Sequence, residues 1–136
     1  MKVDFNVNQK NIDFLSEKIN EEFCKYGVAK PFGFFIQNEN GKVIAGCNGY
    51  TLYGGIYTDQ LWVHRDYRNK GYGRELMNAV HSHGIDSGCS MATVFTMDFQ
   101  GAINFYKKLE YEIEFETSGY IQKSKCLFLK KSLCNV

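Results

Sequence analysis

Residues 68–76, RNKGYGREL, place two glycines among cations directly before a segment with helical spacing. A helix that begins after a glycine turn offers unpaired backbone N–H groups and the positive end of its dipole, and both attract anions. Gly71 and Gly73 have no side chain to keep an anion away from the backbone. One acid, Asp66, stands among the cations Arg65, Arg68, Lys70 and Arg74. The segment fits a diphosphate better than a carboxylate, and an ordinary turn on a basic surface is the alternative.

Two familiar phosphate loops do not match this segment. The Walker pattern requires GxxxxGK[ST], and the dinucleotide fingerprint requires GxGxxG inside a βαβ unit. Neither pattern occurs, and the glycines follow a series of predicted strands joined by hairpins. No acidic residue stands in a clear ribose-binding position, so a nicotinamide or flavin dinucleotide is disfavoured.

Size and charge limit the classes of function. The chain has 136 residues, 44% of them hydrophobic, which predicts one domain over residues 1–136 with a real core. A net charge of +1 gives no reason to expect nucleic acid or an anionic membrane as a partner, and a DNA-binding domain fits poorly. No segment approaches the roughly 20 apolar residues that cross a bilayer, and the start lacks the apolar core of a secretion signal. We therefore expect a cytoplasmic protein.

The cysteines give no sign of a disulfide framework or a metal site. They are odd in number and never spaced as CxxC: Cys24, Cys47, Cys89, Cys126 and Cys134. We expect reduced thiols that mostly pack in the interior, and no metal. A catalytic cysteine with a histidine base, His64, His81 or His83, is the alternative.

The first half of the chain predicts a strand, a helix and three further strands. MKVDF is expected to form a strand, and Asn8 or Asn11 to cap a helix that ends at Gly27. Its apolar residues fall on one face: Ile12, Leu15, Ile19, Phe23 and Tyr26. Residues 31–65 then give three strands, joined by Asn40-Gly41 and by a turn at residues 53–55.

The second half alternates helices with strands. A helix is predicted from Gly71 to about His83, with Leu76 and Val80 on its apolar face. Residues 89–97, CSMATVFTM, predict a strand buried on both faces. Asp98 is expected to cap a short helix to Leu109, followed by strands at 111–116, with Tyr111, Ile113 and Phe115 on one face, and at 121–129. The order β-α-β-β-β-α-β-α-β-β predicts an α/β fold, a mixed sheet covered by helices.

Residues 61–74, LWVHRDYRNKGYGR, resemble the cofactor loop of the GNAT superfamily of N-acetyltransferases. The family pattern is Gln or Arg, two residues, Gly, one residue, then Gly or Ala, and Arg68, Gly71 and Gly73 match it. Residues 98–115, DFQGAINFYKKLEYEIEF, resemble the family's next motif, a helix with a Phe-Tyr pair that leads into a strand. The resemblance covers about residues 42 to 131, and two motifs in the correct order are far more specific than either alone.

The resemblance implies a mainly antiparallel, twisted sheet flanked by helices and splayed between the family's fourth and fifth strands, here residues 61–63 and 89–97. Three positions depart from the family pattern. Arg65 stands where proline is common, Asn69 where glycine is frequent, and Glu110 at the usual glycine of the KLGY turn, where we expect a constrained backbone. The Asn often found just before the Tyr helix is not evident.

The resemblance also implies acetyl-CoA as the cosubstrate. Its pyrophosphate would bind to backbone N–H groups of Arg68, Asn69, Lys70, Gly71, Tyr72, Gly73 and Arg74. Its pantetheine arm would lie along Leu61, Trp62 and Val63, where a bulge exposes backbone groups of Leu61 and Val63. Those groups would polarise the thioester, so that neither a cysteine nucleophile nor a metal is needed.

Tyr106 matches the family's frequent general acid and would also contact the cofactor, although core packing is the alternative role of such a tyrosine. Asp59 is our first choice of general base, and Tyr57 and His64 are alternatives. His81 and His83 are expected near solvent at the end of their helix, and Trp62 within the packed sheet. The aromatic strand residues are expected in the core or along an acceptor pocket: Phe32, Phe34, Phe35, Tyr50, Tyr53 and Tyr57.

The predicted reaction is transfer of an acetyl group to a primary amine, and the alternative is a module that binds acyl-CoA without turnover. The acceptor is a small-molecule amine or a protein amine. The sequence does not specify which amine is used, the preferred acyl chain, or whether the chain acts alone or as a homodimer.

Overall fold

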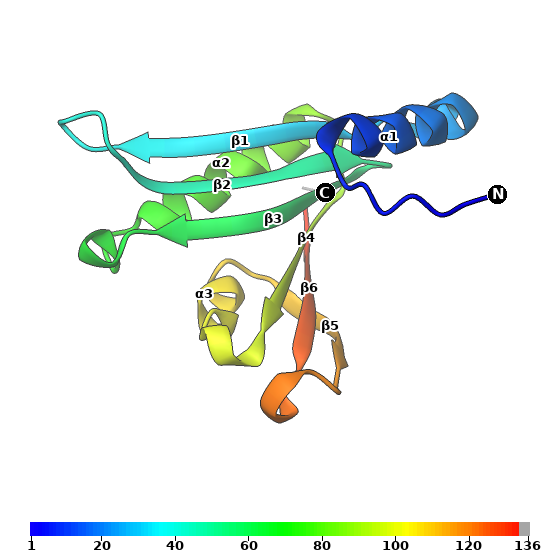
Figure 1. Ribbon diagram of the computed structural model, residues 1–136. Coiled ribbons are helices and arrows are strands. Elements are labelled where there is room, and N and C mark those ends of the chain that lie inside the picture. The colour runs from blue at the N-terminus through cyan, green and yellow to red at the C-terminus, as the bar shows by residue number, and fades with distance from the viewer. Residues whose placement is uncertain (134–136) are drawn as a thin grey trace.

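The computed structural model describes residues 1–133 and shows one six-stranded sheet with two helices on one face and a third helix at its edge (Figure 1). The elements follow in the order α1 (Gln9–Phe23), β1 (Lys30–Gln37), β2 (Val43–Leu52), β3 (Gly55–Val63), α2 (Tyr72–Asp86), β4 (Met91–Met97), α3 (Ile103–Lys108), β5 (Glu112–Thr117) and β6 (Cys126–Ser132). Four 3₁₀ turns connect them: η1 (Cys24–Tyr26), η2 (Arg65–Tyr67), η3 (Asp98–Gln100) and η4 (Ile121–Lys123).

The strand order is β1-β2-β3-β4-β6-β5. Every neighbouring pair is antiparallel except β3 and β4, which are parallel. The predicted mixed, mainly antiparallel sheet is therefore confirmed. The strand predicted for MKVDF is wrong, because residues 1–8 form no strand and their side chains are exposed. The high β-propensity of Val3 and Phe5 has no effect without a neighbouring strand to pair with.

The core lies between the sheet and the helices α2 and α3. Its most enclosed side chains come from both layers: Ile56, Met77, Val80, Val94 and Leu129. Leu76 and Val80 are buried on α2, as their helical spacing predicts. The helix runs past Gly84, which packs against Ile56 and Leu133 where a β-carbon would be crowded.

Both predicted hairpins are present. The β1–β2 connection turns at Gly41, whose φ is 77°. In the β2–β3 hairpin Leu52 pairs with Gly55, so Tyr53 and Gly54 form a two-residue loop. Their φ values of 52° and 82° are those of a type I′ turn, whose twist matches the strands that it joins.

Two predictions about strand faces and one predicted strand boundary in the second half are wrong. Phe95 of β4 is half exposed, so this strand is buried on one face only. In β5 the register shifts between Ile113 and Phe115, which places these two residues on opposite faces rather than on the predicted common face. Residues 121–123 form η4, and the last strand begins at Cys126, because Ser124 closes the turn onto the Ile121 carbonyl.

The short helix α3 is not capped by Asp98. Residues 98–100 form η3, in which the Gln100 side chain accepts a hydrogen bond from the Met97 N–H at 2.8 Å. Gly101, with a φ of 70°, separates this turn from α3. The helix therefore begins at Ile103, several residues later than its sequence suggests.

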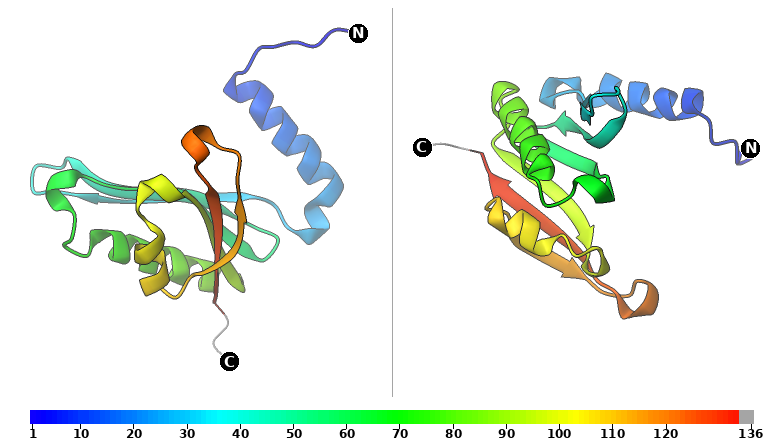
Figure 2. Two further views of the ribbon diagram at one scale, coloured as in Figure 1. Left: turned by 90° about the horizontal axis from the view of Figure 1, so that it is seen from below. Right: turned by 90° about the vertical axis from the view of Figure 1, so that its left-hand side faces the viewer.

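The first helix begins and ends as predicted. The Asn8 side chain accepts a hydrogen bond from the Asn11 N–H at 2.8 Å. At the other end η1 continues α1, and this helical segment ends at Gly27. None of the residues of α1 is buried, and Figures 1 and 2 show the helix projecting from the start of β1, on the side of the sheet opposite α2. Its apolar face is therefore exposed. Within residues 1–133, no helix combines the length and apolar character needed to span a membrane.

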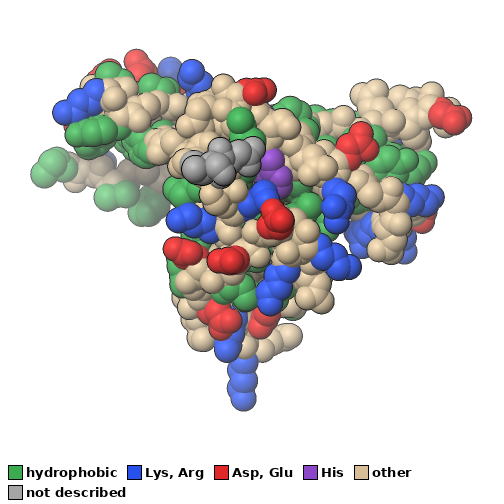
Figure 3. Space-filling view, turned by 180° about the vertical axis from the view of Figure 1, so that it is seen from behind, with side chains coloured by type: hydrophobic (Ala, Val, Ile, Leu, Met, Phe, Trp, Pro, Cys, Tyr) green, Lys and Arg blue, Asp and Glu red, His purple; other side chains and the backbone are tan. Residues whose placement is uncertain are grey.

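Surface charges and thiols are dispersed. On the face seen in Figure 3, basic and acidic side chains are interspersed. Lys125 lies 3.6 Å from Glu116, and Lys131 lies 3.1 Å from Glu110. Cys47 and Cys89 are buried as predicted, whereas Cys24 is exposed on the projecting N-terminal segment. The prediction for Cys134 lies outside the described residues.

Candidate active site

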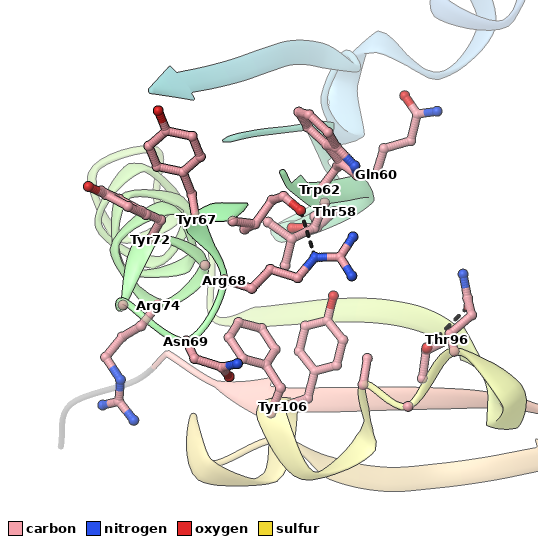
Figure 4. Close-up of a pocket in the computed structure, with 18 of the residues that line it drawn as sticks. Thr58, Gln60, Trp62, Tyr67, Arg68, Asn69, Tyr72, Arg74, Thr96 and Tyr106 are labelled. Atoms are coloured by element: carbon pink, nitrogen blue, oxygen red, sulfur yellow. Dashed lines mark hydrogen bonds between the residues drawn. The ribbon is translucent and has the colours of Figure 1, made fainter. Parts of the chain in front are cut away.

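A cavity of about 900 Å³ opens where β3 and β4 separate. The two strands pair only over Gly55–Thr58 and Met91–Val94, although both continue beyond this ladder. The cavity is bounded by the free end of β3, the loop after it, the start of α2, the end of β4 and α3 (Figure 4). The split predicted between these strands is therefore present.

A β-bulge at Asp59 controls which side chains of β3 face the cavity. Asn48 pairs with Gln60 and Gly49 pairs with Thr58, so Asp59 is the extra residue. Before the bulge Thr58 faces the helices, and after it Leu61 and Val63 pack against the core on that same side. Asp59 itself is exposed at the rim of the cavity.

Beyond Thr58, no strand within residues 1–133 pairs with the edge of β3 that faces the cavity. The Val63 carbonyl on this edge accepts a hydrogen bond from Arg68 Nε at 2.8 Å (Figure 4). Because the N–H and C=O of a strand residue point to the same edge, and every second residue repeats the direction, the N–H groups of Leu61 and Val63 also face the cavity. These groups are backbone donors that a ligand can reach.

The start of α2 supplies a second set of backbone donors. Its N-cap, Gly71, has a φ of 90° and no side chain to satisfy the helix end. The first backbone bond of the helix runs from the Glu75 N–H to the Gly71 carbonyl at 2.9 Å. The N–H groups of Tyr72, Gly73 and Arg74 therefore have no acceptor within the helix. Asn69, with a φ of 61°, adopts the left-handed conformation that Asn tolerates better than most residues.

Gly73 connects the glycine turn to α3. A β-carbon at this position would lie 3.2 Å from the Phe105 ring. The missing side chain therefore allows the start of α2 to pack closely against the helix that carries Tyr106, and both helices contribute to the same cavity.

Tyr106 points from α3 toward β3 and the Arg68 side chain (Figure 4). It is 6% exposed, lines the cavity and makes no hydrogen bond through its hydroxyl to residues 1–133. Burial, with a smaller effect of Cys47, raises the pKa of Tyr106 to about 12. The phenol therefore remains protonated throughout the neutral range and can donate a hydrogen bond into the cavity.

A buried tyrosine–histidine pair lies behind Tyr106. The Tyr111 ring meets that of Tyr106 edge to face at 5.4 Å, and its hydroxyl lies 2.8 Å from His81 Nε2. Burial, followed by the charge of Lys131, lowers the pKa of His81 to about 4. The expectation of a solvated His81 is therefore wrong, because this residue follows Met77 by one helical turn on the buried face of α2 and meets Tyr111 there. Neither partner of the pair lines the cavity.

The model of the acetyltransferase (GNAT) family matches residues 5–111. The chain belongs to the GNAT family of acetyltransferases. An acetyltransferase of Yersinia pestis is 29% identical over 101 residues, which are 74% of this chain and 66% of that protein, just under two thirds of its length. An acetyltransferase structure from Bacillus cereus superimposes with a TM-score of 0.77 at 22% identity, covering 97% of this chain and 98% of the other. An aminoglycoside 6′-N-acetyltransferase complexed with coenzyme A gives 0.70 at 15% identity, covering 100% and 97%. The two structural likenesses establish a shared GNAT fold.

The GNAT fold brings nearly all predicted site residues together. The cavity is lined by Asp59, Leu61, Trp62, Val63, Arg68, Asn69, Gly71, Tyr72, Gly73, Arg74 and Tyr106. Lys70 does not line it, and its ammonium instead lies 5.5 Å from the centre of the Tyr67 ring. Trp62 is half exposed rather than packed, because the bulge turns it away from the helices.

The alternative bases differ in their surroundings. The Tyr57 hydroxyl donates a hydrogen bond to Asp59 Oδ1 at 3.4 Å, and burial, then Asp59 and Tyr50, raise the pKa of Tyr57. His64 Nδ1 accepts from the Asp66 N–H at 3.1 Å, which caps η2, and His64 does not line the cavity. In the part of the chain that the structure describes, no group of His, Cys, Asp and Glu could hold a metal ion.

Several lining residues were not identified from the sequence: Thr58, Gln60, Tyr67, Phe95, Thr96, Gln100, Gly101, Ala102 and Phe105. Phe105 and Gln100 belong to the motif at residues 98–115 that also contains Tyr106, so membership of this motif could have identified them. Thr58 gave no signal, because a threonine in a strand is common. Its Oγ1 is buried and has no hydrogen-bond partner among residues 1–133.

Proposed function

We propose that this GNAT protein is an N-acetyltransferase that moves an acetyl group from acetyl-CoA to a primary amine. One observation carries the proposal. The uncapped start of α2 and the unpaired edge of β3 contribute backbone N–H donors to the same cavity. An anion and an acyl carbonyl on one ligand match these two sets of donors, and the aminoglycoside 6′-N-acetyltransferase with the same fold is complexed with coenzyme A.

The diphosphate of the cosubstrate would bind along residues 68–74. The N–H groups of Tyr72, Gly73 and Arg74 have no helical acceptors, and the positive end of the α2 dipole favours anions there. Arg74 lines the same end of the cavity and adds a positive charge. Gly71 leaves the approach open, because a β-carbon there would meet no atom within 4 Å.

The edge of β3 would hold the acyl end of acetyl-CoA, which supplies an acetyl group activated by its thioester. The N–H groups of Leu61 and Val63 would donate to the carbonyl oxygen, where negative charge grows as the amine attacks. Such fixed donors need no reorganisation during the reaction. Removing one donor of this kind typically costs about 10²–10³ in rate.

Tyr106 would protonate the departing thiolate. Its pKa of about 12 lies roughly 3.5 units above that of an ordinary thiol near 8.5, so full transfer to a free thiolate is uphill by about 5 kcal/mol. We therefore propose that Tyr106 first donates a hydrogen bond to the sulfur and completes the transfer as the new amide gives up its proton. As the N–C bond forms and the C–S bond breaks, the phenol proton goes to sulfur.

Asp59 would accept the proton that the acceptor amine releases, directly or through a water molecule. It lies on the bulge beside the unpaired edge of β3 and is the one carboxylate among the described residues that line the cavity. The Tyr57 hydroxyl, hydrogen-bonded to Asp59, orients the carboxylate. An acceptor that binds as an ammonium loses one proton to become the nucleophile and a second as the amide forms. Asp59 would take these protons in turn and pass them to solvent, the phenol proton goes to sulfur, and Tyr106 is reprotonated from solvent.

The phosphate assignment is tested by placing a carboxylate at Gly71. Gly71→Glu is compared with Gly88→Glu, because both glycines have positive φ, 90° and 80°, open space where a side chain would begin, and positions at opposite ends of α2. Backbone strain is therefore matched. A carboxylate about 5 Å from a diphosphate in water costs roughly 1.5 kcal/mol, or about tenfold in affinity.

Acetyl-CoA affinity is measured by calorimetry, and turnover by release of free thiol with a panel of primary amines. We expect Gly71→Glu to weaken binding at least about tenfold and Gly88→Glu to leave it nearly unchanged. Equal affinities in the two variants would refute the phosphate site. Tight binding without thiol release from any amine would instead identify a binding module without catalysis.

A further inference from the structure

A row of five aromatic rings crosses the face of the sheet that α2 and α3 leave uncovered. Tyr50, Tyr57, Phe95, Phe128 and Phe115 come from β2, β3, β4, β6 and β5, in the order of the strands. Successive ring centres are 5.3, 6.1, 4.8 and 5.0 Å apart. These separations are close to the spacing of about 4.8 Å between neighbouring strands, so the row runs straight across the sheet.

The aromatic row is open to solvent. Tyr50, Phe95 and Phe115 are 40%, 48% and 49% exposed, whereas the side chains on the other face of the same strands form the core. A contiguous row of exposed apolar side chains, unlike single exposed ones, often marks a binding site. Two bulges create the row, since the shift after Ile113 brings Phe115 onto Phe128, and the shift at Asp59 leaves Tyr57 on this face.

The middle of the row lies at the fork between β3 and β4. Tyr57 belongs to the last residues that pair across the fork, and Phe95 is the first residue of β4 beyond the ladder. Phe95 and Asp59 both line the cavity, and Tyr57 is hydrogen-bonded to Asp59. The row therefore leads directly to the carboxylate proposed as the base.

The charges of the cavity limit the acceptor. Among the described lining residues, Asp59 is the sole acid, while Arg68 and Arg74 are cations. One ammonium group is attracted to Asp59 and to the faces of neighbouring rings. A polyamine or an aminoglycoside carries several ammonium groups, and among the described lining residues Asp59 alone could pair with them.

Building on the proposed acetyltransferase activity, we propose that the acceptor is a primary amine with a single positive charge and an aromatic body. Its ring lies against Tyr57 and Phe95 at the fork, and its amine lies beside Asp59. The remaining rings of the row support larger apolar bodies. Specificity then comes from ring contacts on an open sheet face, and the acceptor's charge is matched by one carboxylate.

Initial rates with 2-phenylethylamine, spermidine, kanamycin and a glycine-initiated peptide at saturating acetyl-CoA test the acceptor class. We expect the highest kcat/KM for 2-phenylethylamine, at least about tenfold above spermidine, because lost ring contacts of about 1.5 kcal/mol correspond to that factor. A preference for spermidine, kanamycin or the peptide would refute the acceptor class while leaving the acetyltransferase proposal intact. Failure to release thiol with any amine would refute the acetyltransferase proposal.

Phe95→Ala tests the row itself, and Phe35→Ala is the matched control. Phe35 is an exposed aromatic residue on β1, on the same open face but outside the row. We expect Phe95→Ala to raise KM for 2-phenylethylamine about tenfold with little change in kcat or in acetyl-CoA affinity, and Phe35→Ala to change none of them. Equal KM values in both variants would refute the proposal.

A titration followed by NMR decides the question even without turnover. Shifts of the Tyr57 and Phe128 ring signals with 2-phenylethylamine in the presence of coenzyme A, lost in Phe95→Ala, support the row as the acceptor site, and unchanged signals refute it. A second copy of the chain is the competing occupant of this face. A dimer in sedimentation experiments that Phe95→Ala dissociates would also refute the proposal.

Discussion

Replacing the Tyr106 hydroxyl tests the proton-donor role, and Tyr111 provides an unusually close control. Both residues are buried tyrosines, and their rings are in contact at 5.4 Å. Tyr106 lines the cavity, whereas Tyr111 does not and bonds to His81 at 2.8 Å. The two Tyr→Phe changes therefore each remove one hydroxyl, in one case from the cavity and in the other from a buried hydrogen bond.

We expect the two variants to separate catalysis from stability. Because the Tyr106 hydroxyl bonds to none of residues 1–133, Tyr106→Phe leaves none of their groups unpaired, and the free energy of unfolding should change by less than about 0.5 kcal/mol. Its kcat should fall at least about 100-fold, the usual lower range for a lost proton donor. Tyr111→Phe leaves the buried His81 nitrogen unpaired, which costs about 1–3 kcal/mol of stability. Its kcat should stay within about twofold of the wild type.

The assay is thiol release at saturating acetyl-CoA from pH 6 to 10, combined with urea unfolding. Because the pKa of Tyr106 is about 12, the wild-type phenol keeps its proton over this whole range. The ratio of wild-type to Tyr106→Phe rates should therefore be constant with pH. Equal turnover in Tyr106→Phe, or a matching loss in Tyr111→Phe, would show that the hydroxyl at the cavity is not the donor.

Three further predictions concern stability. The pKa of His81 falls from 6.5 to about 4 on folding, so the unfolded chain binds more protons between these pH values and stability decreases by about 3 kcal/mol as pH drops through them. His81→Gln should remove this part of the difference between the urea midpoints at pH 7 and pH 4.5. An unaltered difference would assign the loss of stability to other groups. Glu110 has a φ of 72°, which strains the backbone of any residue other than glycine. Glu110→Gly should therefore be about 1 kcal/mol more stable than Glu110→Ala, since both variants lose the contact with Lys131 and only alanine retains the backbone strain. Equal thermal midpoints of the two variants would contradict this. Leu15 is 61% exposed, so Leu15→Ala should lower the free energy of unfolding by less than about 0.5 kcal/mol, whereas Leu129→Ala, at an enclosed position, should lower it by about 3 kcal/mol. A large loss for Leu15→Ala would mean that α1 is covered in solution.

Local features of the sequence predicted most of the residues that the structure places together around the cavity. The glycine turn, the cations around it and the following helix are contiguous in the chain, so their relation does not depend on distant residues. Glu110 was expected to constrain the backbone from its place in the KLGY turn, and its positive φ confirms this. Tyr106 was selected by its position in a motif, and the structure places it in the cavity beside Phe105. Its chemical role stays a prediction.

Features that depend on pairing between strands were not predictable in the same way. The bulge within β5 changes the face of Phe115, and alternation along a single strand contains no sign of it. The same limitation applies to Phe95, whose strand is apolar enough to be buried on both faces but is covered on one. For residues 1–8 the pattern favoured a strand, but an edge for it to join depends on the whole sheet. His81 turned inward because α2 lies over Tyr111, a contact between residues 30 positions apart.

The short ladder between β3 and β4 has a mechanical consequence. Within residues 1–133, four residues on each strand form the ladder between the half of the sheet carrying α2 and the half carrying α3, and the Ser90–Gly54 and His81–Tyr111 hydrogen bonds also join the two halves. A molecule that contacts both α2 and Tyr106 would add contacts between the two halves of the sheet. Occupancy of the cavity would then damp the relative breathing of the two halves, and amide hydrogen exchange along Gly55–Thr58 would slow.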